Sequence, residues 1–203
     1  MSAVQKLPDW ITPEEYLESE PASEVRREYV LGHVYAMAGA SDDHSRITLN
    51  ICSELRERLR GKRCEPFSTD MKIRIRHAND TFYYPDVTVA CDPTDNAKYF
   101  RERPSVIFEV ISPDTERTDR REKAYAYWRI PSVEMYLLVE QDQQRITVLR
   151  RAESDWKAET LEGPSAVVKL ECIGVEIPFE RIYERTAIAA SDARNEARKP
   201  STP

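Results

Sequence analysis

The sequence lacks several features that would assign it to a common class of protein. No apolar run approaches the roughly 18 residues needed to cross a bilayer. The N-terminus has no basic start followed by an apolar stretch, so we expect no secretory signal. Only five of the 203 residues are glycine, and there is no glycine-rich phosphate loop. No internal repeat or second domain boundary is visible, so we expect one domain over residues 1–185 and a disordered or frayed tail over 186–203.

Closely spaced cysteine pairs are also missing. The four cysteines are Cys52, Cys64, Cys91 and Cys172, and none belongs to a C-x-x-C motif. Without such pairs we expect free structural thiols rather than a disulfide framework or a zinc site. A reducing cytoplasm is the compartment that this pattern fits.

Positive charge is in deficit overall but concentrated locally. The net charge is −6, which disfavours phosphate binding by the protein as a whole. Residues 54–77 nevertheless contain eight Arg or Lys against four acids, a local charge of +4. This stretch favours a nucleic-acid-binding face, and the alternative is a solvated helix face followed by a charged edge strand.

The hydrophobic periodicity predicts an α/β or α+β fold around a mixed sheet. The strongest helix begins at the N-cap Ser41 and ends at Gly61. In chain order, the expected elements are a helix at 12–19, a hairpin at Leu31-Gly32, the helix 41–61, strands within 64–77, 80–92 and 105–112, a helix at 116–129, strands at 133–140, 145–151 and 156–161, and a closing segment at 174–184.

Two of these elements carry a specific side-chain prediction. The strand within 64–77 alternates apolar with basic residues, so its basic side chains, including Lys72, should face solvent. The helix 116–129 places Ala124 and Trp128 one turn apart on an apolar face, and Pro131 ends it.

Two carboxylates lie where charge is costly to bury. Asp86 follows Pro85 inside the expected strand 80–92, and Glu109 lies in the middle of the most apolar run of the chain. Each carboxylate alone is also compatible with a salt bridge or a hydrogen-bonded strand end. Together, on adjacent strands, they would repel each other, and a bound Mg²⁺ would relieve that repulsion.

A lysine on the following helix completes the candidate site. Helical spacing places Asp119, Lys123 and Tyr127 on one stripe. Near a metal-bound water, Lys123 could orient the water, stabilise developing charge, or act as a base if its pKa falls. The alternative is a surface lysine paired with Asp119.

Three stretches carry a resemblance to a known family. They are REYVLGHVYAMAGAS, YYPDVTVACD and FEVISPDTERTDRREKAYAYWRIPSVEMYLLV, and they resemble the Uma2 (DUF820) family of the PD-(D/E)XK restriction-endonuclease-like superfamily. The resemblance runs from about Thr12 to Tyr183. It implies a restriction-endonuclease-like core, Mg²⁺ held by Asp86 and Glu109, and a homodimer or higher oligomer.

The chain departs from the family pattern at several positions. The superfamily lysine two residues after the acid is replaced by Ile111, which makes Lys123 the candidate. The hairpin keeps Glu28 but has Leu31 and His33 where relatives carry acids on either side of the glycine.

His44 matches a histidine that is frequent at the start of this helix in the family. It would act as a phosphate donor in the site or form a structural hydrogen bond. Glu28 and His44 are therefore auxiliary candidates.

The sequence supports a Mg²⁺-dependent endonuclease, with Mn²⁺ as a possible substitute, that hydrolyses phosphodiester bonds in nucleic acid, which we expect to be DNA. Asp86 and Glu109 would bind the metal, the backbone carbonyl of Val110 would complete the shell, and Lys123 would act on the water. The alternatives are a non-catalytic nucleic-acid-binding or oligomeric scaffold with a degenerate site, and a metal hydrolase of another phosphoester.

Overall fold

A six-stranded mixed sheet forms the centre of the molecule in the computed structural model, which describes residues 10–76, 80–112, 118–153 and 155–189. In their order across this sheet, the strands are β11 (Trp156–Glu162), β10 (Arg145–Arg151), β9 (Met135–Glu140), β8 (Pro104–Ile111), β6 (Val87–Ala90) and β3 (Glu65–Ser68). Only the β8–β9 pair is parallel; the other neighbours are antiparallel. Every residue of β8 is buried, as its continuous apolar run predicted.

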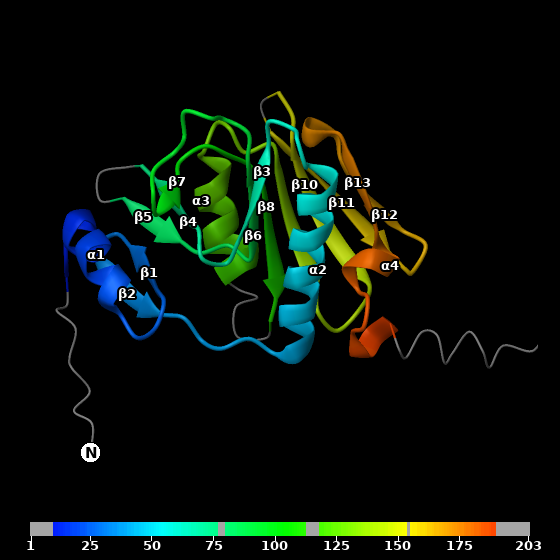
Figure 1. Cartoon of the computed structure of the whole chain (residues 1–203), viewed down its shortest axis with the longest axis horizontal. Helices are drawn as coiled ribbons and strands as arrows, with labels where there is room; N and C mark the ends of the chain where they lie inside the picture. Colours follow the sequence, from blue (N-terminus) through cyan, green and yellow to red (C-terminus); the bar gives the residue numbers. More distant parts are fainter. Residues whose placement is uncertain (1–9, 77–79, 113–117, 154, 190–203) are drawn as a thin grey trace, which may run out of the picture.

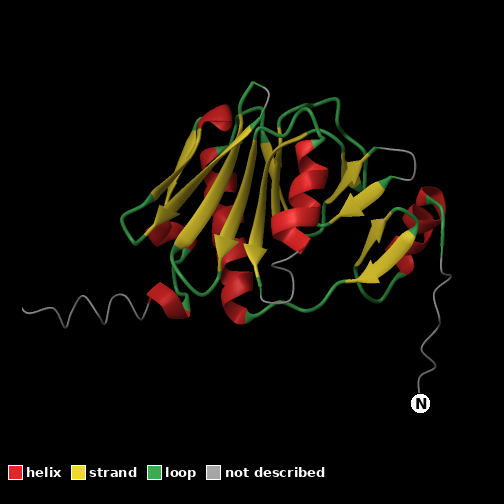
Figure 2. Ribbon diagram, turned by 180° about the vertical axis from the view of Figure 1, so that it is seen from behind, coloured by secondary structure: helices red, strands yellow, loops and turns green. Residues whose placement is uncertain are grey.

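Helices cover both faces of this sheet. The long helix α2 (Asp42–Arg58) lies on one face and is in front in Figure 1, whereas α3 (Ala124–Trp128) lies on the other and is in front in Figure 2. The chain leaves β8, passes through the π-helix η2 (Thr118–Lys123) and α3, and returns as β9. Parallel neighbours require such a crossover.

The sequence explains why α2 forms and where it packs. The Ser41 side chain accepts a hydrogen bond from the backbone N–H of His44 at 3.1 Å, so the predicted N-cap is confirmed. Ile47, Ile51 and Leu55 are fully buried against the sheet, at the spacing of one helix face.

A smaller sheet packs beside the large one, at the left of Figure 1. Its strands, in order, are β2 (His33–Ala36), β1 (Arg27–Val30), β5 (Thr81–Tyr83), β4 (Lys72–Ile75) and β7 (Phe100–Arg101). Helix α1 (Pro13–Ser19), with Thr12 as N-cap, covers it through Tyr16, which contacts Tyr29 and Phe82.

The predicted hairpin at Leu31-Gly32 is confirmed by the β1–β2 pairing. Both turn residues have positive φ, +52° for Leu31 and +99° for Gly32. Glycine adopts this conformation readily, whereas a leucine in it is strained. Leu31 therefore carries a backbone strain that an Asn or Asp would largely avoid.

Two predicted strands are each divided between the two sheets. The stretch 80–92 forms β5 and β6, and Tyr84–Asp86 lies between them, so the prediction of one strand was wrong. Pro85 has no N–H for a ladder, which suits a break at this point. Asp86 consequently precedes β6 rather than lying inside a strand.

The stretch 64–77 likewise forms β3 and β4. The expected alternation fails at Lys72, which is buried and donates to the Tyr84 hydroxyl at 3.0 Å. Burial lowers the pKa of Lys72. Alternation alone could not show that both faces of β4 are covered.

The described part of the predicted helix 116–129 differs in two ways. Residues 118–123 are π-helical, and residues 116 and 117 lie outside the described residues. Ala124 is buried as expected, but Trp128 is 36% exposed and stacks on Trp156. Short π-helical turns frequently occur at functional sites.

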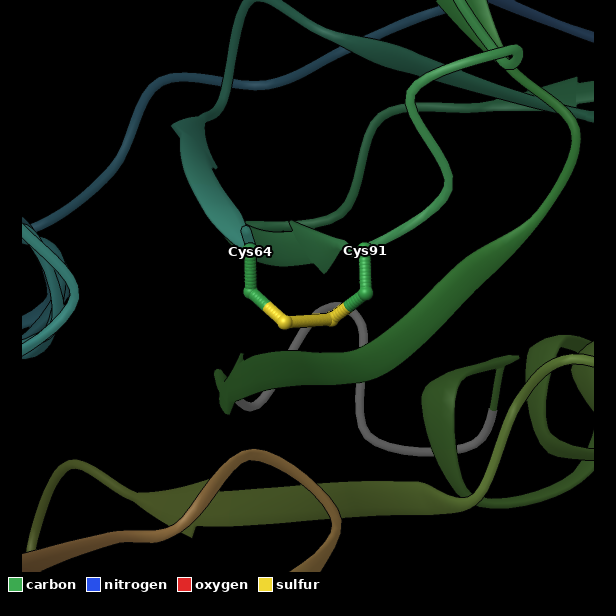
Figure 3. The surroundings of a disulfide bond; sticks show 2 residues. All are labelled: Cys64 and Cys91. Carbon is green, nitrogen blue, oxygen red and sulfur yellow. A yellow bond between two sulfur atoms is a disulfide. The ribbon is translucent and has the colours of Figure 1, made fainter. Parts of the chain in front are cut away.

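The expectation of four free thiols was wrong for two of them. Cys64 and Cys91 form a disulfide with a Cα–Cα distance of 4.0 Å, whereas Cys52 and Cys172 are free. Figure 3 shows the bond joining the segments at the ends of β3 and β6. The register places Cys64 beside Cys91, because Glu65 pairs with Ala90. The cysteine argument for a reducing compartment therefore applies only to the other two thiols.

The C-terminal part adds a two-stranded sheet of β12 (Val167–Leu170) and β13 (Val175–Pro178), followed by α4 (Phe179–Ile182). Thr186 is buried, and the Ala187 N–H donates to Asp43 of α2, so this part of the expected tail packs on the fold. The prediction for residues 190–203 lies outside the described residues. None of the helices in the described part of the chain is both long and apolar enough to cross a membrane.

Candidate active site

The site begins where β6 and β8 lie side by side. Val87 pairs with Phe108 in antiparallel register, so the preceding Asp86 and the following Glu109 face each other across the two strands. The structure thus brings together the two carboxylates predicted from the sequence. Asp86 is mostly buried, and its Oδ2 accepts a hydrogen bond from the Val110 backbone N–H at 2.7 Å.

Glu109 is enclosed. Its Oε1 accepts a hydrogen bond from the Tyr127 hydroxyl at 3.2 Å and lies 3.3 Å from Lys123 Nζ. Burial raises the pKa of Glu109 well above its usual value, and the Lys123 charge only partly opposes this. Nearby Asp119 and Asp86 raise it further. The Glu109 site therefore favours a proton or a cation on this carboxylate.

Lys123 lies at the centre of the site. Its Nζ is 3.1 Å from Glu28 Oε1, 3.3 Å from Glu109 Oε1 and 3.3 Å from Asp119 Oδ1. The side chain is only 7% exposed. The pairing with Asp119 is the one that helical spacing predicted, but the lysine is buried rather than on the surface.

The three carboxylates determine the protonation state of this lysine. Burial alone would lower the pKa of Lys123, but Glu109, Glu28 and Asp119 together hold it well above its usual value. Lys123 is therefore charged at neutral pH. A role as general base, which requires a lowered pKa, does not fit this arrangement.

Glu28 also belongs to the site, although it comes from the hairpin in the other sheet. Besides its contact with Lys123, its Oε1 accepts a hydrogen bond from the Tyr84 backbone N–H at 3.2 Å. In contrast, Leu31 is 49% exposed at the turn and His33 is exposed on β2.

His44 reaches the site from the first turn of α2. Its Nε2 lies 3.3 Å from Asp86 Oδ2. Burial lowers the pKa of His44, but the hydrogen bond and charge of Asp86 outweigh it, and the net shift is upward. The nearby backbone of Val110 adds to this upward shift. His44 therefore faces the site and contacts Asp86 there, and its role as a phosphate donor stays a prediction.

The balance of charge in the site is negative. Among the described residues, four carboxylates contact two cations. The cations are Lys123 and, when it is protonated, His44; the carboxylates are those of Glu28, Asp86, Glu109 and Asp119. Asp119 Oδ1 is buried, and its contact with Lys123 lacks hydrogen-bond geometry. A buried excess of negative charge favours binding of a cation.

The donor set suits a hard divalent ion in one respect. Within the described residues, neither Asp86 Oδ1 nor Glu109 Oε2 has a hydrogen-bond partner, so both remain available to an ion. No group of three or more His, Cys, Asp or Glu residues in the described part of the chain has the geometry of a metal site. Mg²⁺ commonly binds through one or two carboxylates and keeps several waters, so two carboxylates are sufficient.

An acid–base pair next to the site was not predicted. Arg120 of η2 forms an ion pair with Glu140, the last residue of β9. Glu140 is the last residue of a buried strand, and Asp86 directly precedes another. An acid at the end of an apolar strand was therefore the sequence signal for this ion pair. Tyr136 also supports η2, because its hydroxyl donates to the Asp119 carbonyl at 2.8 Å.

Comparison with known proteins identifies the family of this chain. The Uma2 family model, described as "Putative restriction endonuclease", matches residues 13–180. The chain belongs to the Uma2 family. The resemblance inferred from the sequence motifs is therefore confirmed.

Two relatives come from Synechocystis sp. (strain ATCC 27184 / PCC 6803 / Kazusa). Uncharacterized protein slr1290 is 34% identical over 179 residues, which cover 87% of this chain and 93% of the relative. Uncharacterized protein sll1609 is 30% identical over 163 residues, which cover 78% of this chain and 92% of the relative.

A solved structure confirms the fold class of this Uma2 chain. It is the crystal structure of "a putative nuclease belonging to DUF820" from Anabaena variabilis ATCC 29413, with a TM-score of 0.68. The match covers 85% of this chain and 97% of that chain, at 18% sequence identity. The mixed α/β architecture is thus shared, although few side chains are identical.

Proposed function

We propose that this Uma2 protein is a divalent-metal-dependent endonuclease that hydrolyses phosphodiester bonds in DNA. The observation that carries this proposal is the position of Asp86 opposite Glu109, with the Lys123 ammonium 3.3 Å from the Glu109 carboxylate. The description of the family as restriction endonucleases supports the reaction class.

Mg²⁺ fits the two carboxylates, and Mn²⁺ should substitute for it. Asp86 Oδ1 and Glu109 Oε2 would hold the ion. The Val110 carbonyl would complete the shell. When bound, the ion supplies a nucleophilic water of lowered pKa and a Lewis acid for the phosphoryl oxygen.

The residues of the chain have separate tasks in this proposal. Lys123, which is charged, orients the attacking water and holds Glu109 in position. Glu28 and Asp119 keep the ammonium in place. His44 fixes the Asp86 carboxylate from the other side of the sheet.

DNA is the substrate that we favour because an otherwise acidic chain exposes a run of basic residues at the end of α2 and just beyond it, namely Arg56, Arg58, Arg60, Lys62 and Arg63. We also propose a homodimer, because two copies of one site are the simplest way to cut both strands of a duplex. Light scattering of the purified protein, with and without DNA, tests that assembly.

A plasmid-nicking assay tests the function. Wild-type protein should nick supercoiled DNA in Mn²⁺ or Mg²⁺ but not in EDTA. Asp86→Asn and Lys123→Ala should each reduce the nicking rate by at least about 100-fold. Glu176→Gln changes an exposed acid of β13 and should have no effect.

Three outcomes separate the alternatives. If the wild type nicks DNA in neither metal, the proposed enzyme is wrong. DNA binding without nicking would support the non-catalytic scaffold. A phosphatase-like activity with weak salt dependence would indicate another phosphoester.

A further inference from the structure

A side chain that binds a phosphodiester must be positively charged and accessible to the substrate. The cationic residues of the site differ in their accessibility. Lys123 is 7% exposed and lies between three carboxylates. His44 is mostly buried and is bound to Asp86. Both cations hold the acidic site together, so neither is well placed to bind a phosphate oxygen directly.

Arg120 differs from these residues in its exposure. Its side chain is 31% exposed, although it ion-pairs with a Glu140 side chain that is only 10% exposed. A guanidinium has five N–H donors in a planar fork, and this geometry matches a phosphate. Arg120 is held by Glu140 and still partly faces solvent.

The strand register places this pair close to Glu109. Glu109 pairs with Leu138, and two residues further on Ile111 pairs with Glu140, so Glu109 and Glu140 project from the same face of the sheet. Two residues along a strand and one strand across correspond to roughly 8 Å between the two Cα positions. Arg120 reaches Glu140 from η2.

The order of residues in η2 explains how one turn serves both purposes. Asp119 and Lys123 point inward to the carboxylates and are buried. Arg120, next to Asp119 in sequence, is directed toward the end of β9 instead. Arg121 is exposed. The π-helical turn thus directs Lys123 toward the buried carboxylates and Arg120 toward the edge of the site.

We propose that Arg120 is the residue that binds the phosphate of the nucleic acid substrate, and that Glu140 is the positioning residue that aims it. This inference rests on the proposed nuclease function and adds a substrate-binding residue to it. Arg120 would contact a non-bridging oxygen of the scissile or adjacent phosphate and neutralise the charge that accumulates there during hydrolysis.

The test compares Arg120→Gln with Arg121→Gln, a change in the neighbouring exposed arginine of the same turn. With saturating plasmid and Mn²⁺, Arg120→Gln should lower the nicking rate about 100-fold, and Arg120→Lys should recover part of it. Arg121→Gln should stay within about twofold of wild type, because phosphate contacts outside the site affect binding more than the rate at saturation.

Folding and metal binding are controlled separately. Arg120→Gln leaves Glu140 without its ion pair, so the double variant Arg120→Gln/Glu140→Gln should restore the melting temperature but not the nicking rate. Both variants should keep the stabilisation by Mn²⁺ that wild type shows. Binding of a short duplex is measured in Ca²⁺ at several salt concentrations. The slope of log affinity against log salt should become about one unit shallower in Arg120→Gln, as expected for the loss of one phosphate contact.

The outcomes distinguish this inference from the function on which it rests. If wild type nicks DNA and Arg120→Gln nicks it equally fast, the role of Arg120 is wrong and the nuclease stands. If the double variant recovers the rate, Arg120 is only structural. If wild type does not nick DNA, the function and the inference fail together.

Discussion

The two faces of the β8–β9 pair have opposite chemistry, although they belong to the same strands. Toward α2, Phe108 and Val110 enter a wholly apolar core with Leu55. Toward η2 and α3, Glu109 lies between Ile107 and Ile111 and meets a buried lysine. Side chains alternate along a strand, so one residue step changes a position from packing to chemistry.

This difference shows how the fold can support a charged site. Buried ion pairs contribute little net stability, because desolvation offsets their attraction. Apolar burial stabilises by roughly 25 cal/mol per Å². We therefore expect the α2 face to supply the stability and the η2 face to depend on charge balance, pH and bound cations.

Lys123→Met should have the largest effect, because it removes the cation that lies between three carboxylates. We expect a loss of about 3–5 kcal/mol at neutral pH, measured by urea unfolding. The pKa of Glu109 is already raised and should rise further, so Glu109 takes up a proton more readily as pH falls. The deficit should therefore shrink toward acidic pH. A deficit independent of pH would mean that Lys123 contributes through packing alone.

Leu55→Ala provides the matched change on the apolar face. It should cost about 2–5 kcal/mol, because it leaves a cavity under α2. This loss should be the same between pH 5.5 and 8.5 and unaffected by Mn²⁺. A pH-dependent loss would show that the two faces are coupled through the strands.

The apolar face was the more predictable one. The four-residue spacing of Ile47, Ile51 and Leu55 predicted α2, and the apolar run predicted the central strand β8. These patterns are local, since the residues that define them lie within one element. Glu109 and Lys123 were predicted as well, the first as an acid in an apolar run and the second from its helical spacing.

The remaining features depend on which segments are neighbours in space. The break at Pro85 separates strands of two sheets, and the burial of Lys72 follows from a covering layer that alternation does not indicate. The Cys64–Cys91 disulfide depends on the β3–β6 register. The Arg120–Glu140 pair likewise requires the end of β9 to lie beside η2.

His44 joins the two faces, because it starts on α2 and contacts Asp86. Its folded-state pKa is raised, so its stabilising contribution is complete below its unfolded pKa and is lost as pH rises through the folded value. In EDTA, the stability difference between wild type and His44→Asn should be larger at pH 5.5 than at pH 8.5. Urea unfolding at both pH values measures it, and an increase with pH would contradict the Asp86 interaction.

Leu31→Asn should have the smallest effect and lies outside both faces. Leu31 has φ +52° and is 49% exposed, so the change relieves strain and loses little packing. We expect a gain of about 1 kcal/mol by urea unfolding. Leu31→Val should instead destabilise the protein, because a β-branched residue is poorer at positive φ. If both variants lose stability, the leucine contributes contacts that outweigh its strain.

Thermal unfolding with increasing Mn²⁺ tests the central claim, that the excess carboxylate charge of the η2 face binds a divalent ion. At ten times its dissociation constant, the ion should stabilise wild type by about 1.4 kcal/mol, or roughly 3–6 °C in melting temperature. Asp86→Asn should abolish this shift, and Leu55→Ala should melt lower yet keep it. If neither Mn²⁺ nor Mg²⁺ raises the melting temperature of wild type, or if Asp86→Asn shows the full shift, the metal site is wrong.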